Sequence, residues 1–477
     1  MSKRGKEGAP GRTRTASGAG GPPSTGRELA RQVLLRVEED GAYANRALAA
    51  ALDRTTTLSG AERGLATELV YGVLRRRARL DRALESVADR GLSSLPANAR
   101  SVLRVGAYQM LFLDRIPSYA AVNDAVEAMK RAHGPRLGGL ANALLRRLSE
   151  RGEPPLPEAA RDPMAHLAEA WGWPAWLARL ALRELGQDAA LALAASAGEG
   201  APLALRTNRL ASAPTLTREA LADRLAAERP GAVIVPSAIA PDALLARGLE
   251  APARTLAFSE GAFSIEDVGA QVVAELCGAA PGERILDACA GLGGKTAHLA
   301  ALAGNAADIE ALDLSQAKLR QAEEQWARLG ARGVEARAAD LTRDFPPDTK
   351  PYDRVLLDAP CSGLGVIRRH PEVLLRRSEA DLTLLAATGR RMLDVVAPVV
   401  APGGLLTYAV CTFDRVEGED VVDAFLAAHP DFQIEAPVRA GGAVPWARLT
   451  AAGEVVRLWP HRDDADAFFA VRLRRRG

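Results

Sequence analysis

The chain has 477 residues, of which 48% are apolar and 25% charged, and its net charge is +2. This length predicts two to four domains, and the composition is typical of a soluble globular protein. The sequence lacks both the apolar run of a membrane span and the apolar region of a signal peptide. Its four separated cysteines form neither a disulfide framework nor a C-x-x-C metal site, so we expect a cytoplasmic protein without a metal.

Charge is distributed unevenly along the chain. Residues 1–26 carry a net charge of +4, residues 27–151 carry +7, and the remainder carries −9. A basic front part joined to an acidic back part indicates polyanion binding in the first and chemistry in the second. Scattered surface charge is the alternative explanation, and the charge totals alone leave both open.

The first third of the chain contains two kinds of sequence. Residues 1–26 are rich in Gly, Ser, Pro, Thr and basic residues and have little to bury, which predicts a disordered basic tail. Residues 27–151 show the apolar spacing of helices, as at Leu29, Val33 and Val37. Glycines and prolines break this pattern into short segments, so an all-helical bundle is expected.

The rest of the chain has a different character. The proline-rich stretch 152–157 predicts a stiff linker, and residues 152–262 are expected to form linker helices and a small α+β module. In residues 263–477, short apolar runs alternate with helical patterns. This alternation predicts a doubly wound α/β domain with a parallel sheet. The last apolar run, Phe468–Val471, is expected to add an antiparallel strand at the sheet edge.

A glycine-rich turn between a predicted strand and a predicted helix marks a candidate cofactor site. This run, 287–296, has the form of a loop that cradles a nucleotide-like ligand, but a P-loop is excluded because Cys289 stands where that motif needs glycine. Three later strands end near acids: Asp313 for a ribose, Asp340 for an adenine amino group and Asp358 near the reactive end. These carboxylates suit the cationic sulfonium of S-adenosylmethionine. They would repel a pyrophosphate, which disfavours an NAD-dependent dehydrogenase.

Cys361 and Cys411 both follow predicted strands, at the edge where α/β sheets bind ligands. Carbon 5 of a pyrimidine is too weak a nucleophile to take a methyl group directly, whereas a thiolate that adds to carbon 6 converts the ring into a reactive enamine. Asp358, two residues before Pro360, is placed to act as an acid near the ring nitrogen, protonated or sharing a proton with the base. This chemistry alone allows either cysteine as the nucleophile. Cys277 and Cys289 are interpreted as packing residues.

Three segments resemble the RNA cytosine-5 methyltransferases of the RsmB/Sun (Fmu) family: Asp287–Thr296, Leu357–Pro371 and Tyr408–Glu419. Residues 27–150 resemble the NusB-type RNA-binding domain that precedes the catalytic part in this family. The resemblance implies a Rossmann-like, S-adenosylmethionine-dependent methyltransferase domain that modifies a cytosine in 16S ribosomal RNA. It also implies a monomer whose partner is ribosomal RNA, with neither membrane nor metal.

The resemblance assigns roles to residues. It implies Cys411 as the nucleophile, Cys361 as the residue that assists product release, and Asp358 beside the ring. The cofactor contacts that it implies come from Cys289, Ala290, Gly291, Leu292, Gly293, Gly294, Lys295, Asp313, Asp340 and Asp358. A basic stretch is expected near the RNA, with a solvated turn as the alternative: Arg368, Arg369 and His370.

The chain departs from the family pattern at a few positions. Gly291 and Leu292 stand where Ala-Pro is usual, Val410 where Thr is usual, Glu266 where Gln is usual and Gly418 where Asn is usual. A non-enzymatic alternative is an RNA-binding assembly factor that uses the methyltransferase domain only as a platform. The intact thiols, carboxylates and lysine argue against that alternative.

Overall fold

The computed structural model describes residues 23–210, 216–343, 345, 349–437, 443–451 and 454–477. Residues 1–22 of the expected tail lie outside the described residues. Helix α1 begins at Gly26, and the Thr25 side chain accepts a hydrogen bond from the Glu28 backbone N–H at its start. Within the part of the chain that is described, no helix is both long and apolar enough to cross a bilayer.

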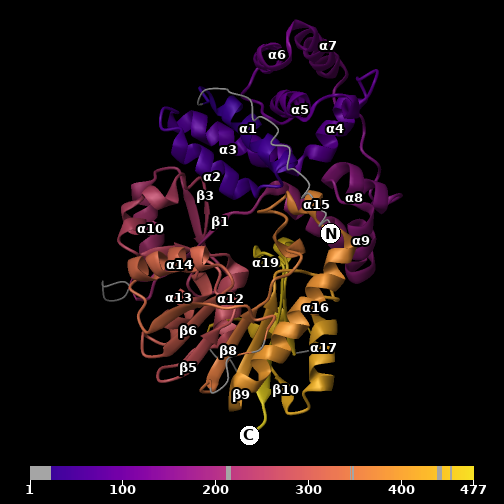
Figure 1. Cartoon of the computed structure of the whole chain (residues 1–477). Coiled ribbons are helices and arrows are strands. Elements are labelled where there is room, and N and C mark those ends of the chain that lie inside the picture. The colour runs from indigo at the N-terminus through magenta and orange to yellow at the C-terminus, as the bar shows by residue number, and fades with distance from the viewer. Residues whose placement is uncertain (1–22, 211–215, 344, 346–348, 438–442, 452–453) are drawn as a thin grey trace, which may run out of the picture.

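A bundle of helices forms the first part of the molecule (Figure 1). Its helices are α1 (Gly26–Glu39), α2 (Ala44–Arg54), α3 (Gly60–Arg75), α4 (Arg77–Glu85), α5 (Ala97–Phe112), α6 (Ser118–His133) and α7 (Pro135–Arg151), with a 3-10 turn η1 (Leu92–Ser94). They share one apolar core in which Leu29 and Leu103 are fully buried. Helices α3 and α5 approach closely because Gly72 has no side chain where the Tyr108 ring lies. The all-helical prediction is confirmed.

The linker leads to two helices that pack against the last part of the chain. Arg82 donates hydrogen bonds to the carbonyls of Pro154 and Pro155 at 2.8 and 2.7 Å, which fixes the linker against α4. Helices α8 (Pro163–Trp171) and α9 (Ala175–Glu199) follow. Trp173 then stacks on Phe413, with ring centroids 6.4 Å apart. These helices therefore share a core with the last part of the chain.

A small antiparallel sheet forms the middle module. Its strand order is β2-β3-β1-β4, from β1 (Leu203–Thr207), β2 (Val233–Pro236), β3 (Ala243–Arg247) and β4 (Phe263–Ile265). The module also contains α10 (Arg218–Glu228), α11 (Leu256–Ser259) and η2 (Pro252–Arg254). Phe263 is fully buried in the core of this module. The small sheet therefore extends to residue 265, three residues beyond the boundary that the sequence suggested.

The large sheet is mixed. Parallel strands lie in the order β7-β6-β5-β8-β9, from β5 (Arg284–Asp287), β6 (Asp308–Asp313), β7 (Val334–Ala338), β8 (Tyr352–Asp358) and β9 (Val400–Val410). Antiparallel to β9 lies β13 (Phe468–Arg475), whose other edge pairs with β12 (Val455–Leu458) and β10 (Phe432–Glu435), and β11 (Thr450–Ala451) follows β12. The last strand is antiparallel, as expected, but it is not at the edge. Its continuously buried residues fit this interior position.

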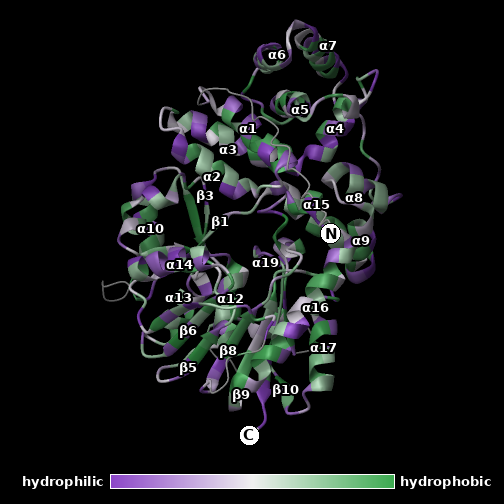
Figure 2. Cartoon of the chain, viewed as in Figure 1, coloured by the Kyte–Doolittle hydropathy of each residue, from purple (hydrophilic) through white to green (hydrophobic). Residues whose placement is uncertain are grey.

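Helices cover both faces of the large sheet (Figure 1). One face packs against α12 (Val268–Cys277), α13 (Gly294–Leu302) and α14 (Gln316–Leu329), and the other against α16 (Glu379–Val396) and α17 (Glu419–Ala428). Neighbouring residues alternate between the faces, so Ile285 joins one core and Leu286 the other. Figure 2 shows that these strands are largely apolar. Short elements complete the chain: η3 (Leu364–Val366), α15 (Val373–Arg376), η4 (Ala397–Val399), α18 (Trp446–Leu449) and α19 (Pro460–Asp463).

Candidate active site

The carboxyl ends of the parallel strands place the predicted functional groups along one edge of the large sheet. Because the strand order is β7-β6-β5-β8-β9, these groups follow one another in space in the order Asp340, Asp313, Asp287, Asp358 and Cys411. In an α/β sheet this edge is where ligands bind. The topology therefore brings together carboxylates and thiols that are far apart in the sequence.

The glycine-rich loop between β5 and α13 lies tightly against α14. Gly291 and Gly293 have φ values of 58° and 79°, which favour glycine. A Cβ atom at Gly293 would lie 2.7 Å from the Cβ of Ala322. The indole N–H of Trp326 donates a hydrogen bond to the Gly293 carbonyl at 2.9 Å. This packing fixes the loop with its backbone at the N-terminus of α13.

Asp313 lies beside this loop. Its carboxylate accepts hydrogen bonds from the backbone N–H groups of Gly291 at 3.1 Å and Ser315 at 2.8 Å. Two large apolar side chains nearby in sequence are exposed, Leu292 by 52% and Leu314 by 75%. A carboxylate can bind ribose hydroxyls and an exposed apolar side chain can pack on an adenine, so these residues would suit the adenosyl part of S-adenosylmethionine.

Asp340 is more exposed than the other acids at this edge. Its carboxylate accepts hydrogen bonds from the backbone N–H and the hydroxyl of Thr342, at 3.1 and 2.6 Å, and pairs with Arg343 at 3.2 Å. The hydrogen bonds from Thr342 lower the pKa of Asp340. The side chain is therefore ionised at neutral pH. Its contact with an adenine stays a prediction.

Lys295 and Asp358 form an ion pair near the middle of the site, with Nζ 2.6 Å from Oδ2. Burial by itself would lower the pKa of Lys295, but the charge of Asp358 and its hydrogen bond outweigh burial, and the pKa is raised. Lys295 is therefore a firmly held ammonium group. Behind it, burial raises the pKa of Asp287 to about 6 although Thr296 donates a hydrogen bond to its carboxylate at 2.7 Å.

The two predicted thiols are in contact. The Sγ atoms of Cys361 and Cys411 lie 3.2 Å apart, and either can donate a hydrogen bond to the other. The hydrogen bond between Cys411 and Cys361, together with burial and the nearby Asp358, raises the pKa of Cys411 well above its usual value, while Lys295 acts in the opposite direction. Cys277 is buried among apolar residues, as expected for a packing role. All four cysteines are free thiols.

Glu417 connects the two cysteine loops, and the sequence analysis did not identify it. Its carboxylate accepts hydrogen bonds from the backbone N–H of Ser362, at 2.7 Å, and from the Ser362 hydroxyl. Its carbonyl accepts a hydrogen bond from the Tyr408 hydroxyl at 2.8 Å. Burial raises the pKa of Glu417 to about 7. The sequence feature that could have identified Glu417 is its position six residues after Cys411, within the segment Tyr408–Glu419.

Two further contacts hold the cysteine loops in place. The backbone N–H of Gly365 donates a hydrogen bond to the Cys411 carbonyl at 3.0 Å, and its own carbonyl accepts one from the Ala467 N–H at 3.0 Å. Arg377 donates hydrogen bonds to the carbonyls of Ser362 at 2.8 Å and Cys361 at 3.4 Å. The backbone around both thiols is therefore held by hydrogen bonds from several elements.

The basic stretch expected near the RNA is mostly engaged within the protein. Arg368 is 3% exposed and lies 3.2 Å from Asp466. Arg369 pairs with Asp466 at 3.0 Å and with Asp267 at 2.6 Å. These pairs show that both arginines are engaged with carboxylates of the protein and do not form a solvated turn, while their nearness to the RNA stays a prediction. An aspartate far away in sequence supplies the partner, which local sequence does not reveal.

The same segment contacts the helical domain. His370 lies edge-on to Tyr43, with ring centroids 6.4 Å apart. Glu372 accepts a hydrogen bond from the backbone N–H of Ala44 at 3.0 Å, and the guanidinium group of Arg376 lies 4.2 Å from the centroid of the Tyr43 ring. Residues 368–377 therefore join the start of α2 to the loop that carries Cys361. We refer to them as the connecting segment.

Glu266, which departs from the family pattern, has a structural explanation. Its carboxylate accepts a hydrogen bond from Nε of Arg206 at 2.7 Å, and both residues are buried. A buried guanidinium group requires a charged partner, which a glutamine would not provide. The departure therefore matches the arginine on β1.

Comparison with known proteins agrees with this geometry. Residues 276–474 match the family model described as 16S rRNA methyltransferase RsmB/F, and residues 24–150 match the NusB family. The chain is 33% identical to the probable ribosomal RNA small subunit methyltransferase B of Bacillus subtilis, over 94% of this chain and 99% of that protein. It is 34% identical to ribosomal RNA small subunit methyltransferase B of Pseudomonas putida, over 90% of this chain and 95% of that protein. The crystal structure of PH0851 has the same fold, with a TM-score of 0.76 at 23% identity over 94% and 98% of the two chains. The chain therefore belongs to the RsmB/F family of 16S rRNA methyltransferases and has a NusB domain in front of its catalytic part.

Proposed function

We propose that the protein transfers a methyl group from S-adenosylmethionine to carbon 5 of a cytosine in 16S ribosomal RNA, through a covalent adduct with Cys411. The observation that carries this proposal is the contact between two thiols, 3.2 Å apart, beside an ion pair of Lys295 and Asp358. These groups share one sheet edge with the loop suited to the cofactor. Family membership supports ribosomal RNA as the substrate.

The two thiols have different roles: Cys411 attacks the ring, and Cys361 assists release of the product. When bound, S-adenosylmethionine supplies a methyl group on a cationic sulfonium. The Cys411 thiolate adds to carbon 6 of the ring, which makes carbon 5 nucleophilic. The proton that Cys411 loses passes to the ring nitrogen through Asp358. After the methyl group has moved, Cys361, which lies against Cys411, takes the carbon 5 proton as a thiolate. The bond between carbon 6 and Cys411 then breaks, and the Cys411 thiolate recovers the proton from the ring nitrogen.

Asp358 and Lys295 act at the ring nitrogen. Addition of the thiolate places negative charge on the ring, and a proton at the nitrogen stabilises it. Asp358, which Lys295 holds at 2.6 Å, shares this proton with the ring nitrogen. The target cytosine must leave any stacked context to reach these groups. The NusB domain, with a charge of +7 over residues 27–151, would hold the RNA backbone.

A labelled-methyl assay tests the reaction. The full-length protein is incubated with S-adenosylmethionine carrying a labelled methyl group and with unmodified 16S RNA, and the RNA is digested to nucleosides. We expect the label in 5-methylcytidine. A folded sample that binds the cofactor and gives no labelled 5-methylcytidine contradicts the proposal, and label in another nucleoside contradicts the assignment to carbon 5.

Variants of the two cysteines test their roles. Cys411→Ser should lower turnover by at least about a thousandfold, because an alcohol is a far weaker nucleophile at neutral pH. Cys361→Ser should still form the bond to RNA, so a protein–RNA adduct should persist on a denaturing gel. Cys277→Ser is the matched control, since that thiol packs in the core away from the sheet edge. Full turnover by Cys411→Ser with loss in Cys361→Ser would reverse the two roles.

A further inference from the structure

Three side chains that are far apart in the sequence meet beneath the small module, away from the thiols. Asp242 precedes β3, Glu275 lies on α12 and His298 lies on α13. One possible ligand atom from each lies within 4.8 Å of the others. Glu275 is 8% exposed and His298 is 1% exposed, so this cluster belongs to the interior. Nothing in the proposed methyl transfer uses these residues.

The buried members of this cluster have unused polar atoms. Both ring nitrogens of His298 and Oε1 of Glu275 lack a hydrogen-bond partner among the residues that the structure describes. The distance between His298 Nε2 and Glu275 Oε1 is 3.7 Å, which is too long for a hydrogen bond. Buried polar groups in proteins are almost always satisfied, so an unsatisfied imidazole beside a carboxylate indicates a missing partner.

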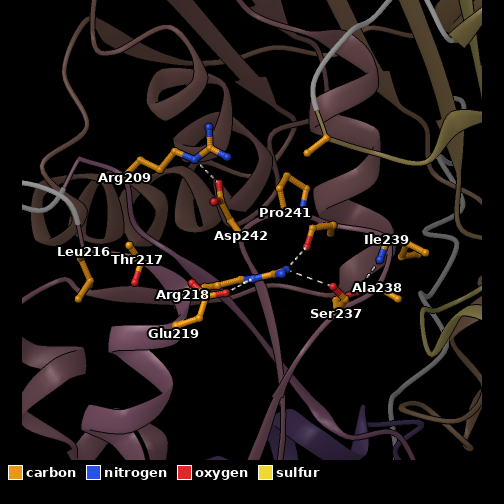
Figure 3. A pocket seen from close by; sticks show the side chains of 12 residues that line it. Arg209, Leu216, Thr217, Arg218, Glu219, Ser237, Ala238, Ile239, Pro241 and Asp242 are labelled. Atoms are coloured by element: carbon orange, nitrogen blue, oxygen red, sulfur yellow. Dashed lines mark hydrogen bonds and ion pairs between the residues drawn. The ribbon is translucent and has the colours of Figure 1, made fainter.

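Asp242 connects this buried pair to the outside. It lies in the wall of a cavity of about 470 Å³, together with Arg209, Arg218 and Ser237. Figure 3 shows the Asp242 carboxylate directed toward Arg209, whose Nε is 2.6 Å from Oδ2. Asp242 is therefore the member of the cluster that faces the cavity.

We propose that Asp242, Glu275 and His298 bind one zinc ion, with water from the cavity as the fourth ligand. Imidazole and carboxylate are zinc ligands, and three protein ligands with an open position form a known type of site. Tetrahedral ligands around zinc lie about 3.3 Å apart, so the three side chains need only a small contraction. An ion pair between a protonated His298 and Glu275 is the competing explanation, but the 3.7 Å between Nε2 and Oε1 is longer than the contact that a buried charge-assisted hydrogen bond makes.

The zinc ion would link three elements of the fold. His298 lies one helical turn after Lys295 on α13, so the ion would tie the helix at the cofactor loop to α12 and to the small module. Such a link is structural. The sequence analysis expected no metal because the cysteines lack the spacing of a metal site. Residues 242, 275 and 298 are far apart in the sequence, and the fold brings them together.

Metal binding by the full-length protein tests this site. Metal-free protein is dialysed against zinc, and the bound metal is measured by elemental analysis. We expect one equivalent per chain, an increase in the melting temperature with zinc, and a loss of affinity of more than about tenfold in His298→Gln and Glu275→Gln. The control variant is His461→Gln, because His461 is exposed and of the same residue type. It should bind like the unmodified protein.

The competing outcomes are distinguishable. Binding that disappears in Cys411→Ser would show that the thiol pair holds the metal, and it would overturn the proposal. Absence of stoichiometric binding by the unmodified protein, or unchanged binding by folded His298→Gln, would also overturn it. If both ligand variants fail to fold, cobalt bound to the unmodified protein decides. Cobalt bands without sulfur charge-transfer absorption support the site, and charge-transfer absorption refutes it. Neither result depends on methyl transfer.

Discussion

Glu417 is 1% exposed, and its carboxylate accepts hydrogen bonds from the Ser362 backbone and hydroxyl. Burial raises the pKa of Glu417 from 4.5 to about 7, against those hydrogen bonds, which lower it. The folded protein therefore holds this proton more tightly than the unfolded chain does. The stability that follows is fully present below about pH 4.5 and is lost as the pH rises through about 7.

Replacing Glu417 with glutamine should remove this pH dependence. Glutamine stays neutral, accepts from the Ser362 N–H and donates to its hydroxyl, so the variant should resemble the protonated acid. The free energy of unfolding of the unmodified protein should fall by up to about 3 kcal/mol more than that of Glu417→Gln between pH 4.5 and pH 7.5. Denaturant titrations at several pH values measure this difference. Parallel pH profiles of the two proteins would contradict it.

At the scale of elements, η3 shows how backbone contacts position the thiols. A Cβ atom at Gly365 would collide with the Ala467 carbonyl oxygen and lie 2.8 Å from that of Cys411. Both are backbone atoms and cannot rotate away. We therefore expect Gly365→Ala to separate the two cysteine loops and to lower kcat by at least about a hundredfold, because misplacement by about 1 Å costs that much.

The matched control for Gly365→Ala is Gly139→Ala on α7, where nothing lies within 4 Å of the added atom. That substitution should leave kcat unchanged and raise helix stability slightly. Methyl-transfer rates under saturating substrates measure both variants. Equal rates for Gly365→Ala and the unmodified protein would show that the contact does not position the thiols.

Much of this architecture follows from local sequence, and some of it does not. Apolar runs that end at Asp287, Asp313 and Asp358 predict both the strands and the edge that they share, because period and burial are local properties. Arg369 and Glu417 are different. Their partners lie on other elements, so a lone arginine or acid in a motif does not reveal whether it meets solvent or a buried charge. For the same reason, the sequence analysis wrongly expected β13 at the sheet edge. Strand order depends on pairings across the whole domain, which local sequence does not reveal.

At the scale of the whole molecule, Arg369 joins three parts of the chain. It pairs with Asp267 just before α12 and with Asp466 just before β13, and it donates a hydrogen bond to the Pro202 carbonyl at 2.9 Å. Burial would raise the pKa of Asp267, but the charges of Arg369 and Arg368 lower it. Asp267 is therefore ionised in the folded protein.

Asp267→Asn should destabilise the protein by about 3 kcal/mol, because it leaves a largely buried guanidinium group short of one charge. Urea unfolding at neutral pH measures this change. Asp308→Asn is the control, since Asp308 is 69% exposed and pairs with Arg284 at 3.4 Å. It should change the free energy of unfolding by less than about 0.5 kcal/mol. Equal effects of the two substitutions would contradict the role given to Arg369.

The connecting segment has a consequence for how substrate is sensed. The helical domain holds it through the Ala44–Glu372 hydrogen bond and the Tyr43 ring, while Arg377 holds the Cys361 loop. If RNA binding tilts the helical domain, these contacts would carry the movement to the loop of Cys361. Coupling between two sites is reciprocal, so a base bound at Cys411 would change the affinity of the helical domain for RNA by the same factor. An RNA that contacts both ends would then be held more firmly than an RNA that contacts one end only.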